Sequence, residues 1–263
     1  MEQSPLAPQM TGNVLFYKNP EPISPEEHGK LGVKRVDHPH AFVAETHVVP
    51  LTVAEFPAAS LSYPVIFVGD KVKTALAVMG LRSGDNLFVD KKGDFSPEAY
   101  IPAFVRRYPF VFANEKDSDR LLLCIDRDAD FISEQYDMPF FENGKPSEYT
   151  NQAMQFCNDF EVERRRTEQF MELLAENDLL AKRDAVFTPA NADGTAGAPQ
   201  KIAEYWAVSD EKLAKLSPEK LAELRDNGAL GHIYTHMLSL MGWDRLVAMA
   251  IIRNSENQQA ANA

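Results

Sequence analysis

Short apolar segments separated by turn residues dominate the first half of the chain. Runs rich in β-branched and aromatic residues lie between Pro, Gly, Asn and Asp positions, which is typical of strands. These runs predict strands at 14–17, 42–49, 65–68, 76–79, 86–89, 110–113 and 121–125. The alternation of apolar and polar residues over 41–48 predicts one buried strand face. Ser96 and Pro97 predict the start of a short helix over 96–107, which Pro102 interrupts.

The pattern becomes helical after Pro139. Apolar residues at helical spacing predict the longest element, a helix over 149–180. Ser209 is positioned to cap a helix over 210–216, and Ser217 to cap another that Gly228 ends. Two apolar helices are predicted at 230–241 and 243–252, and the stretch 191–199 predicts a flexible loop.

This order of elements predicts an α+β fold. We expect a mostly antiparallel N-terminal β region with short helices, packed against C-terminal helices. The expected organisation is a single domain over 13–253, β-rich at 13–137 and helix-rich at 138–253. Residues 1–12 and 254–263 are predicted to be flexible tails.

Composition and charge narrow the class of protein. The 263 residues are 44% hydrophobic and 25% charged, which is an ordinary globular balance. The formal net charge of −12 disfavours nucleic acid as a partner, because an acidic surface repels phosphates. No apolar run reaches the length of a membrane span, and the first ten residues do not resemble a secretory signal. The two cysteines, Cys124 and Cys157, favour a reducing cytoplasm over a disulfide framework.

Several residues resemble parts of catalytic or metal sites, but none completes one. Asp126 and Asp128 follow an apolar strand, as the nucleophile and acid of aspartyl-phosphate phosphatases do, yet the residues after them differ from that motif. The pairs His38 with His40, and His232 with His236, each offer two metal ligands without a recognisable third. We therefore predict no catalytic residue, metal or cofactor. If the protein is instead an enzyme, these six residues are the candidates for its chemistry.

An unusual concentration of rings and guanidinium groups lies at 100–110. This segment contains Tyr100, Arg106, Arg107 and Tyr108, and arginine both stacks on rings and binds carboxylates. These four residues are the predicted binding residues for a partner. The alternative is an internal brace in which the arginines are neutralised inside the fold. The arginine triplet 164–166 also has two alternatives. It forms either an anion site or a solvated helix face of ion pairs.

Ordered motifs along the chain resemble the SapC family. They include Tyr63-Pro64-Val65-Ile66-Phe67, the segments 84–90, 100–102, 106–110 and 123–126, and the C-terminal segments 212–216 and 228–240. The resemblance spans roughly residues 13–250, with Phe95 standing where we expect Trp. It implies an association with bacterial surface-layer (S-layer) proteins and their export. The family has no agreed catalytic residues to carry over, and a peptide-transporter permease of the same name is unrelated.

Two classes of function follow from these observations. The first is a non-catalytic cytoplasmic accessory protein that binds another protein, in the handling or export of surface-layer proteins. The alternative is an enzyme, or the partner of an enzyme, in a modification pathway linked to a halogenase or oxygenase. This alternative is implied by the proteins that family members are often encoded beside. No oligomeric state is predicted.

Overall fold

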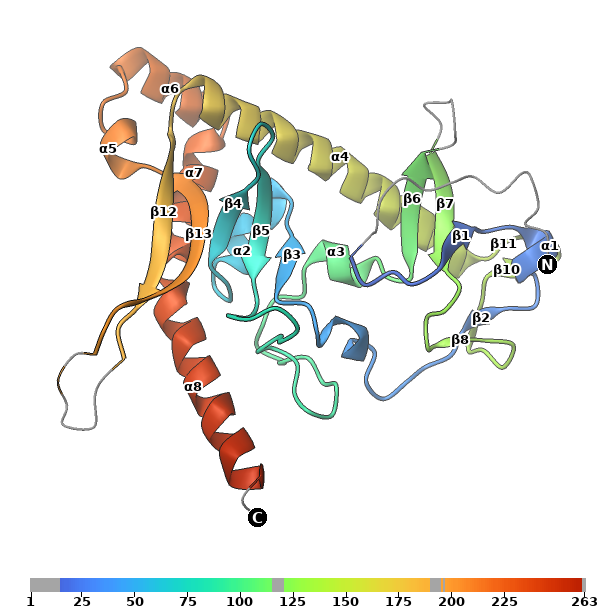
Figure 1. The fold of residues 1–263 in the computed structure, drawn as a ribbon. Helices are drawn as coiled ribbons and strands as arrows, with labels where there is room; N and C mark the ends of the chain where they lie inside the picture. Colours follow the sequence, from blue (N-terminus) through green and yellow to red (C-terminus); the bar gives the residue numbers. More distant parts are fainter. Residues whose placement is uncertain (1–14, 115–120, 190–194, 196, 262–263) are drawn as a thin grey trace.

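The protein has the α+β architecture that the sequence predicts. The computed structural model describes residues 15–114, 121–189, 195 and 197–261. Antiparallel sheets lie mainly in the N-terminal half, and helices dominate the C-terminal half (Figure 1). The predicted tail 1–12 and most of the predicted loop 191–199 lie outside the described residues. Within the described ranges, no helix combines the length and apolarity that crossing a membrane requires.

A five-stranded antiparallel sheet lies in the larger hydrophobic core. Its strand order is β12-β13-β4-β5-β3. The strand bounds are β3 (Val48–Pro50), β4 (Val65–Val68), β5 (Thr74–Val78), β12 (Leu180–Phe187) and β13 (Gln200–Val208). Three consecutive residues of β4 are buried, because helices cover the sheet. The strands β12 and β13 come from the second half of the chain, so this sheet joins the two halves.

Smaller sheets surround a second core at the other end of the molecule. Here β1 (Pro20–Pro22), β7 (Leu121–Asp126) and β6 (Phe110–Asn114) form one antiparallel sheet. A second sheet contains β8 (Ile132–Ser133), β2 (Gly32–Val33) and β9 (Met138–Pro139). A short hairpin joins β10 (Phe141–Glu142) and β11 (Lys145–Pro146). Short helices connect the strands, namely α1 (Pro25–His28), η1 (Ala41–Val43), η2 (Val53–Glu55), α2 (Phe56–Ala59) and α3 (Ala103–Arg106).

The predicted long helix is confirmed as α4 (Glu148–Glu176). Ser147 caps it by accepting a hydrogen bond from the Thr150 amide, and its buried face packs against both sheet regions (Figure 1). The helix ends four residues before the predicted limit, because Asp178 turns the chain at a positive φ of 51° into β12. The arginine triplet lies on a face of ion pairs, since Arg164 pairs with Glu161 and Glu168 while Arg166 pairs with Glu163.

Four helices complete the C-terminal half. They are α5 (Asp210–Leu213), α6 (Pro218–Asp226), α7 (Ala229–Ser239) and α8 (Gly242–Ala261). Ser209 and Ser217 cap α5 and α6 as predicted, each accepting a backbone amide hydrogen bond. Gly228, at φ 81°, separates α6 from α7 in the left-handed conformation that glycine adopts without strain. The predicted end of the last helix at residue 252 is wrong, because α8 continues to Ala261.

Three predicted elements in the first half are wrong or truncated. The segment 42–49 contains the 3-10 helix η1, and a strand begins only at Val48. Residues 86–89 form a turn with one isolated bridge between Val89 and Phe95. The helix predicted over 96–107 is reduced to α3, because Pro102 stands at its N-cap in an extended conformation.

Two further differences concern the ends of the sheets. Of the strand predicted at 14–17, Val14 lies outside the described residues, and Phe16 adopts a positive φ of 53° within a turn. The hairpin of β12 and β13 was not predicted. Its exposed, charged positions weaken the apolar signal, as the β12 sequence LAKRDAVF shows.

Candidate functional site

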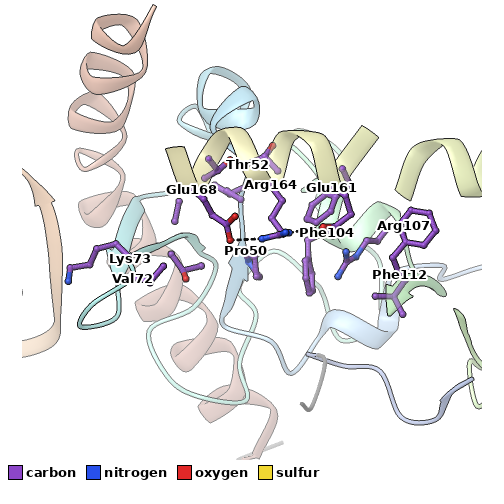
Figure 2. A pocket seen from close by; sticks show the side chains of 16 residues that line it. Pro50, Thr52, Val72, Lys73, Phe104, Arg107, Phe112, Glu161, Arg164 and Glu168 are labelled. Carbon is purple, nitrogen blue, oxygen red and sulfur yellow. Dashed lines mark hydrogen bonds and ion pairs between the residues drawn. The ribbon is translucent and has the colours of Figure 1, made fainter. Parts of the chain in front are cut away.

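A cavity of about 380 Å³ lies where both sheets meet α4 (Figure 2). The strand β3 contributes Pro50, β5 contributes Ala75, and β6 contributes Val111 and Phe112. The helix α3 contributes Phe104 and Arg107, the latter from its C-terminal end. Residues of α4 close the cavity, namely Phe160, Glu161, Arg164, Thr167 and Glu168. The lining therefore combines phenylalanine rings with charged side chains.

Arg107 is a buried cation on the apolar side of this cavity. Its side chain is only 7% exposed, and its guanidinium carbon lies 4.1 Å from the ring centre of Phe104 and 4.5 Å from that of Phe160. Its Nε atom is buried without a hydrogen-bond partner. Among the described residues, no carboxylate forms an ion pair with Arg107, whereas stacking on two rings partly stabilises the charge.

Two weakly acidic side chains that interact with Arg107 stay neutral at physiological pH. Burial raises the pKa of the Cys157 thiol to about 12, although the Arg107 charge opposes the shift. Burial also raises the pKa of Tyr17, whose hydroxyl donates a hydrogen bond to the Phe110 carbonyl at 2.6 Å. Neither side chain therefore supplies the negative charge that Arg107 lacks.

The other arginine that lines the cavity, Arg164, is paired with carboxylates. Arg164 donates to Glu161 at 2.7 Å and also to Glu168, and Figure 2 shows these ion pairs bordering the cavity. The hydrogen bond to Glu161 raises the pKa of Arg164, so this side chain stays charged and paired. Arg164 is also partly exposed, whereas Arg107 is buried.

The structure separates the four predicted binding residues. Tyr100 and Arg106 remain partly exposed, and an Arg106 Nη donates to the Tyr100 hydroxyl at 3.1 Å. Arg107 and Tyr108 are buried, as an internal brace would be, but no carboxylate of the described residues neutralises Arg107 as that alternative expects. Tyr108 stacks on Phe42 with ring centres 4.1 Å apart.

The Asp126 carboxylate is held by hydrogen bonds inside the fold. It is completely buried and accepts hydrogen bonds from the backbone amides of Lys18 and Asn19 at 2.9 and 2.7 Å. The Tyr108 hydroxyl donates a third bond to it at 2.9 Å. Asp128 points to solvent, so the two carboxylates do not converge as an aspartyl-phosphate site requires.

The histidine pairs also occupy separate environments. His38 is exposed and its Nδ1 lies 2.8 Å from an oxygen of Asp94, a hydrogen bond that raises the His38 pKa. His40 packs edge-on against Phe95, and burial lowers its pKa. Within the part of the chain that the structure describes, no three His, Cys, Asp or Glu side chains gather as metal ligands.

The pair on α7 packs into the core. His236 is fully buried, stacks on Phe67 at 4.3 Å and accepts a hydrogen bond from the Val208 amide through Nε2. Burial lowers its pKa to about 3, so the ring is neutral. His232 lies edge-on to Phe56 and Phe170, and burial lowers its pKa as well.

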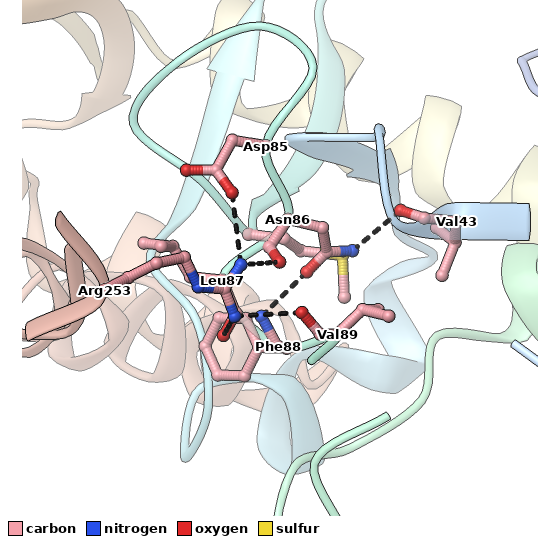
Figure 3. A network of polar contacts seen from close by, with 8 residues as sticks. Val43, Asp85, Asn86, Leu87, Phe88, Val89 and Arg253 are labelled. Atoms are coloured by element: carbon pink, nitrogen blue, oxygen red, sulfur yellow. Dashed lines mark hydrogen bonds and ion pairs between the residues drawn. The ribbon is translucent and has the colours of Figure 1, made fainter. Parts of the chain in front are cut away.

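Sequence reasoning missed a contact between the last helix and a loop of the first half. The Arg253 guanidinium donates to the backbone carbonyls of Asn86, Leu87 and Val89 at 2.7 to 3.0 Å and to Asp85 at 3.1 Å (Figure 3). A single arginine in a polar C-terminal segment gave no signal for this role. These hydrogen bonds hold α8 against the loop that follows β5.

Sequence reasoning also missed an exposed apolar surface on α7. Tyr234 and Leu238, four residues apart on α7, are 50% and 65% exposed, and Met241, in the turn that follows the helix, is 77% exposed. We call these three residues the α7 strip. The helix itself contains no Asp, Glu, Lys or Arg, so the strip lies on an uncharged element of an acidic protein. The sequence shows that these residues are apolar, but their spacing alone assigns them to the core and not to the surface.

Comparisons with known proteins identify the family of the chain. Neither the curated proteins nor the solved structures contain a match to this chain. The model of the SapC family matches residues 23–246, which covers most of the chain. This range includes both cores, the cavity beside Arg107 and the α7 strip. The chain therefore belongs to the SapC family.

Proposed function

We propose that this protein is a non-catalytic accessory protein that binds another protein through the α7 strip. The observation that carries the proposal is the exposure of Tyr234 and Leu238 on α7 and of Met241 in the turn that follows it. Large apolar side chains that gather at the surface mark interaction sites, whereas singly scattered ones do not. Docking an apolar helix face against a complementary groove or helix is a common mode of recognition.

The chemistry of the strip favours a protein over a lipid surface as its partner. Binding to anionic lipid depends on basic residues beside the apolar face. The helix α7 has none, and the chain carries a formal charge of −12. A partner with an uncharged apolar contact surface fits the strip best.

The proposed place of action is the cytoplasm, in the handling or export of surface-layer proteins. Cys124 and Cys157 are both buried free thiols, which suits a reducing compartment. Membership of the SapC family supports the link to surface-layer proteins, since that association gives the family its name. Tyr100 and Arg106, at α3, form a second, sequence-predicted contact candidate.

Site-specific photocrosslinking in native cells tests this proposal. A photoreactive amino acid replaces Leu238, and the matched control replaces Val186, which is 53% exposed on β12. We expect a discrete heterologous protein to be crosslinked at position 238 and absent at position 186. The double substitution L238D and M241D should then abolish retention of that purified partner, while circular dichroism shows an unchanged fold.

Three results would contradict the proposal. One is an identical set of crosslinked proteins at positions 238 and 186. Another is full retention of the partner by the L238D and M241D variant. The third is a crosslinked product that contains only two copies of this chain, because the strip would then be a homodimer interface.

A further inference from the structure

Arg107 is buried without a carboxylate partner among the described residues. Burying an ion without a counter-ion is unfavourable even after its surroundings relax. Stacking on Phe104 and Phe160 recovers part of that cost, yet it leaves the Nε donor without an acceptor. By contrast, two carboxylates contact Arg164, which lines the same cavity.

The space beside Arg107 is large enough for a small molecule. Its volume of about 380 Å³ lies in the range of small-molecule sites, which combine apolar walls with few convergent polar groups. Figure 2 shows the Arg107 side chain beside Phe104 at one end of this space. Val111, Phe112 and Phe160 extend the apolar wall around it.

The charges of the lining residues select the sign of a ligand. Arg164 is paired with Glu161 and Glu168, and the Lys73 ammonium lies over the Trp206 ring, 4.4 Å from its centre. Among the described residues that line the cavity, Arg107 is therefore a buried cation that no carboxylate contacts. A carboxylate on a ligand would pair with Arg107, and the fork of a guanidinium fits a carboxylate in particular.

The geometry points to a binding site for a small organic monocarboxylate with an apolar body, whose carboxylate binds Arg107 and whose body packs on Phe104, Phe112 and Phe160. This site is separate from the α7 strip and does not depend on the proposed protein-binding function. The neighbouring cavity of about 360 Å³ beside Arg106 is a weaker candidate. There the guanidinium already donates to the Ile101 carbonyl and the Tyr100 hydroxyl.

Titration calorimetry with octanoate tests this inference on the full-length protein. Octanoate supplies one carboxylate and a flexible apolar chain, and 1-octanol is the neutral probe of matched shape. We expect octanoate to bind wild type at least about tenfold more tightly than 1-octanol, because a charge-assisted hydrogen bond in a dry site contributes on that scale. The substitution R107Q should weaken octanoate binding by a similar factor and leave 1-octanol binding unchanged.

A matched control comes from the adjacent residue. R106Q removes a guanidinium that lines the neighbouring cavity, so it should leave octanoate binding unchanged. The inference is overturned if wild type binds neither probe at millimolar concentration, or binds both equally. It is also overturned if R107Q binds octanoate as wild type does. Should R107Q fail to fold, the comparison of the two probes on wild type decides by itself.

Discussion

The burial of His236 makes the stability of the protein depend on pH in a defined window. The folded pKa is about 3, chiefly because burial disfavours the charged ring and also because Arg183 repels it, against 6.5 when the chain is unfolded. Above pH 6.5 the ring is neutral in both states, and its contribution to stability is complete. As the pH falls below 6.5, the unfolded chain binds a proton that the folded protein does not, so stability is lost progressively down to about pH 3.

The size of this loss follows from the difference between the two pKa values. Between pH 7.5 and pH 5.0 it amounts to about 2 kcal/mol, a large fraction of the stability of an ordinary domain. The substitution H236Q keeps an acceptor for the Val208 amide but removes the titrating group. Its lost stacking on Phe67 lowers stability equally at both pH values, so it cancels when each protein is compared with itself.

Urea unfolding at pH 7.5 and pH 5.0 measures the effect. Wild type should lose about 2 kcal/mol more than H236Q on acidification. H38Q is the control with the opposite sign, since Asp94 raises the pKa of this exposed histidine. The stability that His38 contributes is complete below pH 6.5 and is lost as the pH rises through its folded value. Equal acid sensitivity of wild type and H236Q would refute the reasoning.

Three further predictions, two with matched controls, concern Arg253, Asp126 and Gly231 and are checked by denaturant unfolding. R253Q removes a cation that bridges three carbonyls and should destabilise by about 2–4 kcal/mol, whereas R165Q, on an exposed position of α4, should change stability by less than about 0.5 kcal/mol. D126A leaves three donors unpaired and should cost about 3 kcal/mol or more, against almost nothing for the exposed Asp128 in D128A. G231A places a methyl group in open space inside α7 and should stabilise by about 0.5–1 kcal/mol. Equal effects of R253Q and R165Q, or of D126A and D128A, would contradict the contacts of Arg253 or Asp126. A destabilising G231A would contradict the open space at Gly231.

The sequence predicted elements well where local physics decides them. The helix α4 and the caps Ser209 and Ser217 follow from periodicity and side-chain chemistry within a few residues. The strand β4 was predicted at its observed bounds for the same reason, because a short apolar run lies between Pro64 and Gly69.

Prediction failed where distant contacts override local pattern. The alternation over 41–48 belongs to a 3-10 turn and a strand end, whose positions depend on packing against Tyr108 and Asn86. The strands β12 and β13 show only a weak apolar alternation, because many of their residues are exposed.

The candidate site was predictable only in part. Sequence reasoning singled out Arg107 for its density of neighbouring rings and left open whether it docks a partner or braces the fold. The structure shows that Phe104 and Phe160, from different helices, enclose it. That juxtaposition depends on how α3 meets α4, which no local pattern contains.

The contribution of β13 to the central sheet has a consequence during protein synthesis. Residues 48–78 can pair among themselves as soon as they leave the ribosome, but one side of β4 receives its partner only after residue 208 has been translated. Until then the nascent chain carries an open, apolar strand margin, the kind of surface on which chains aggregate and to which chaperones bind. Mutations that slow closure of the β12–β13 hairpin should therefore reduce the yield of soluble protein more than they reduce the stability of molecules that have already folded.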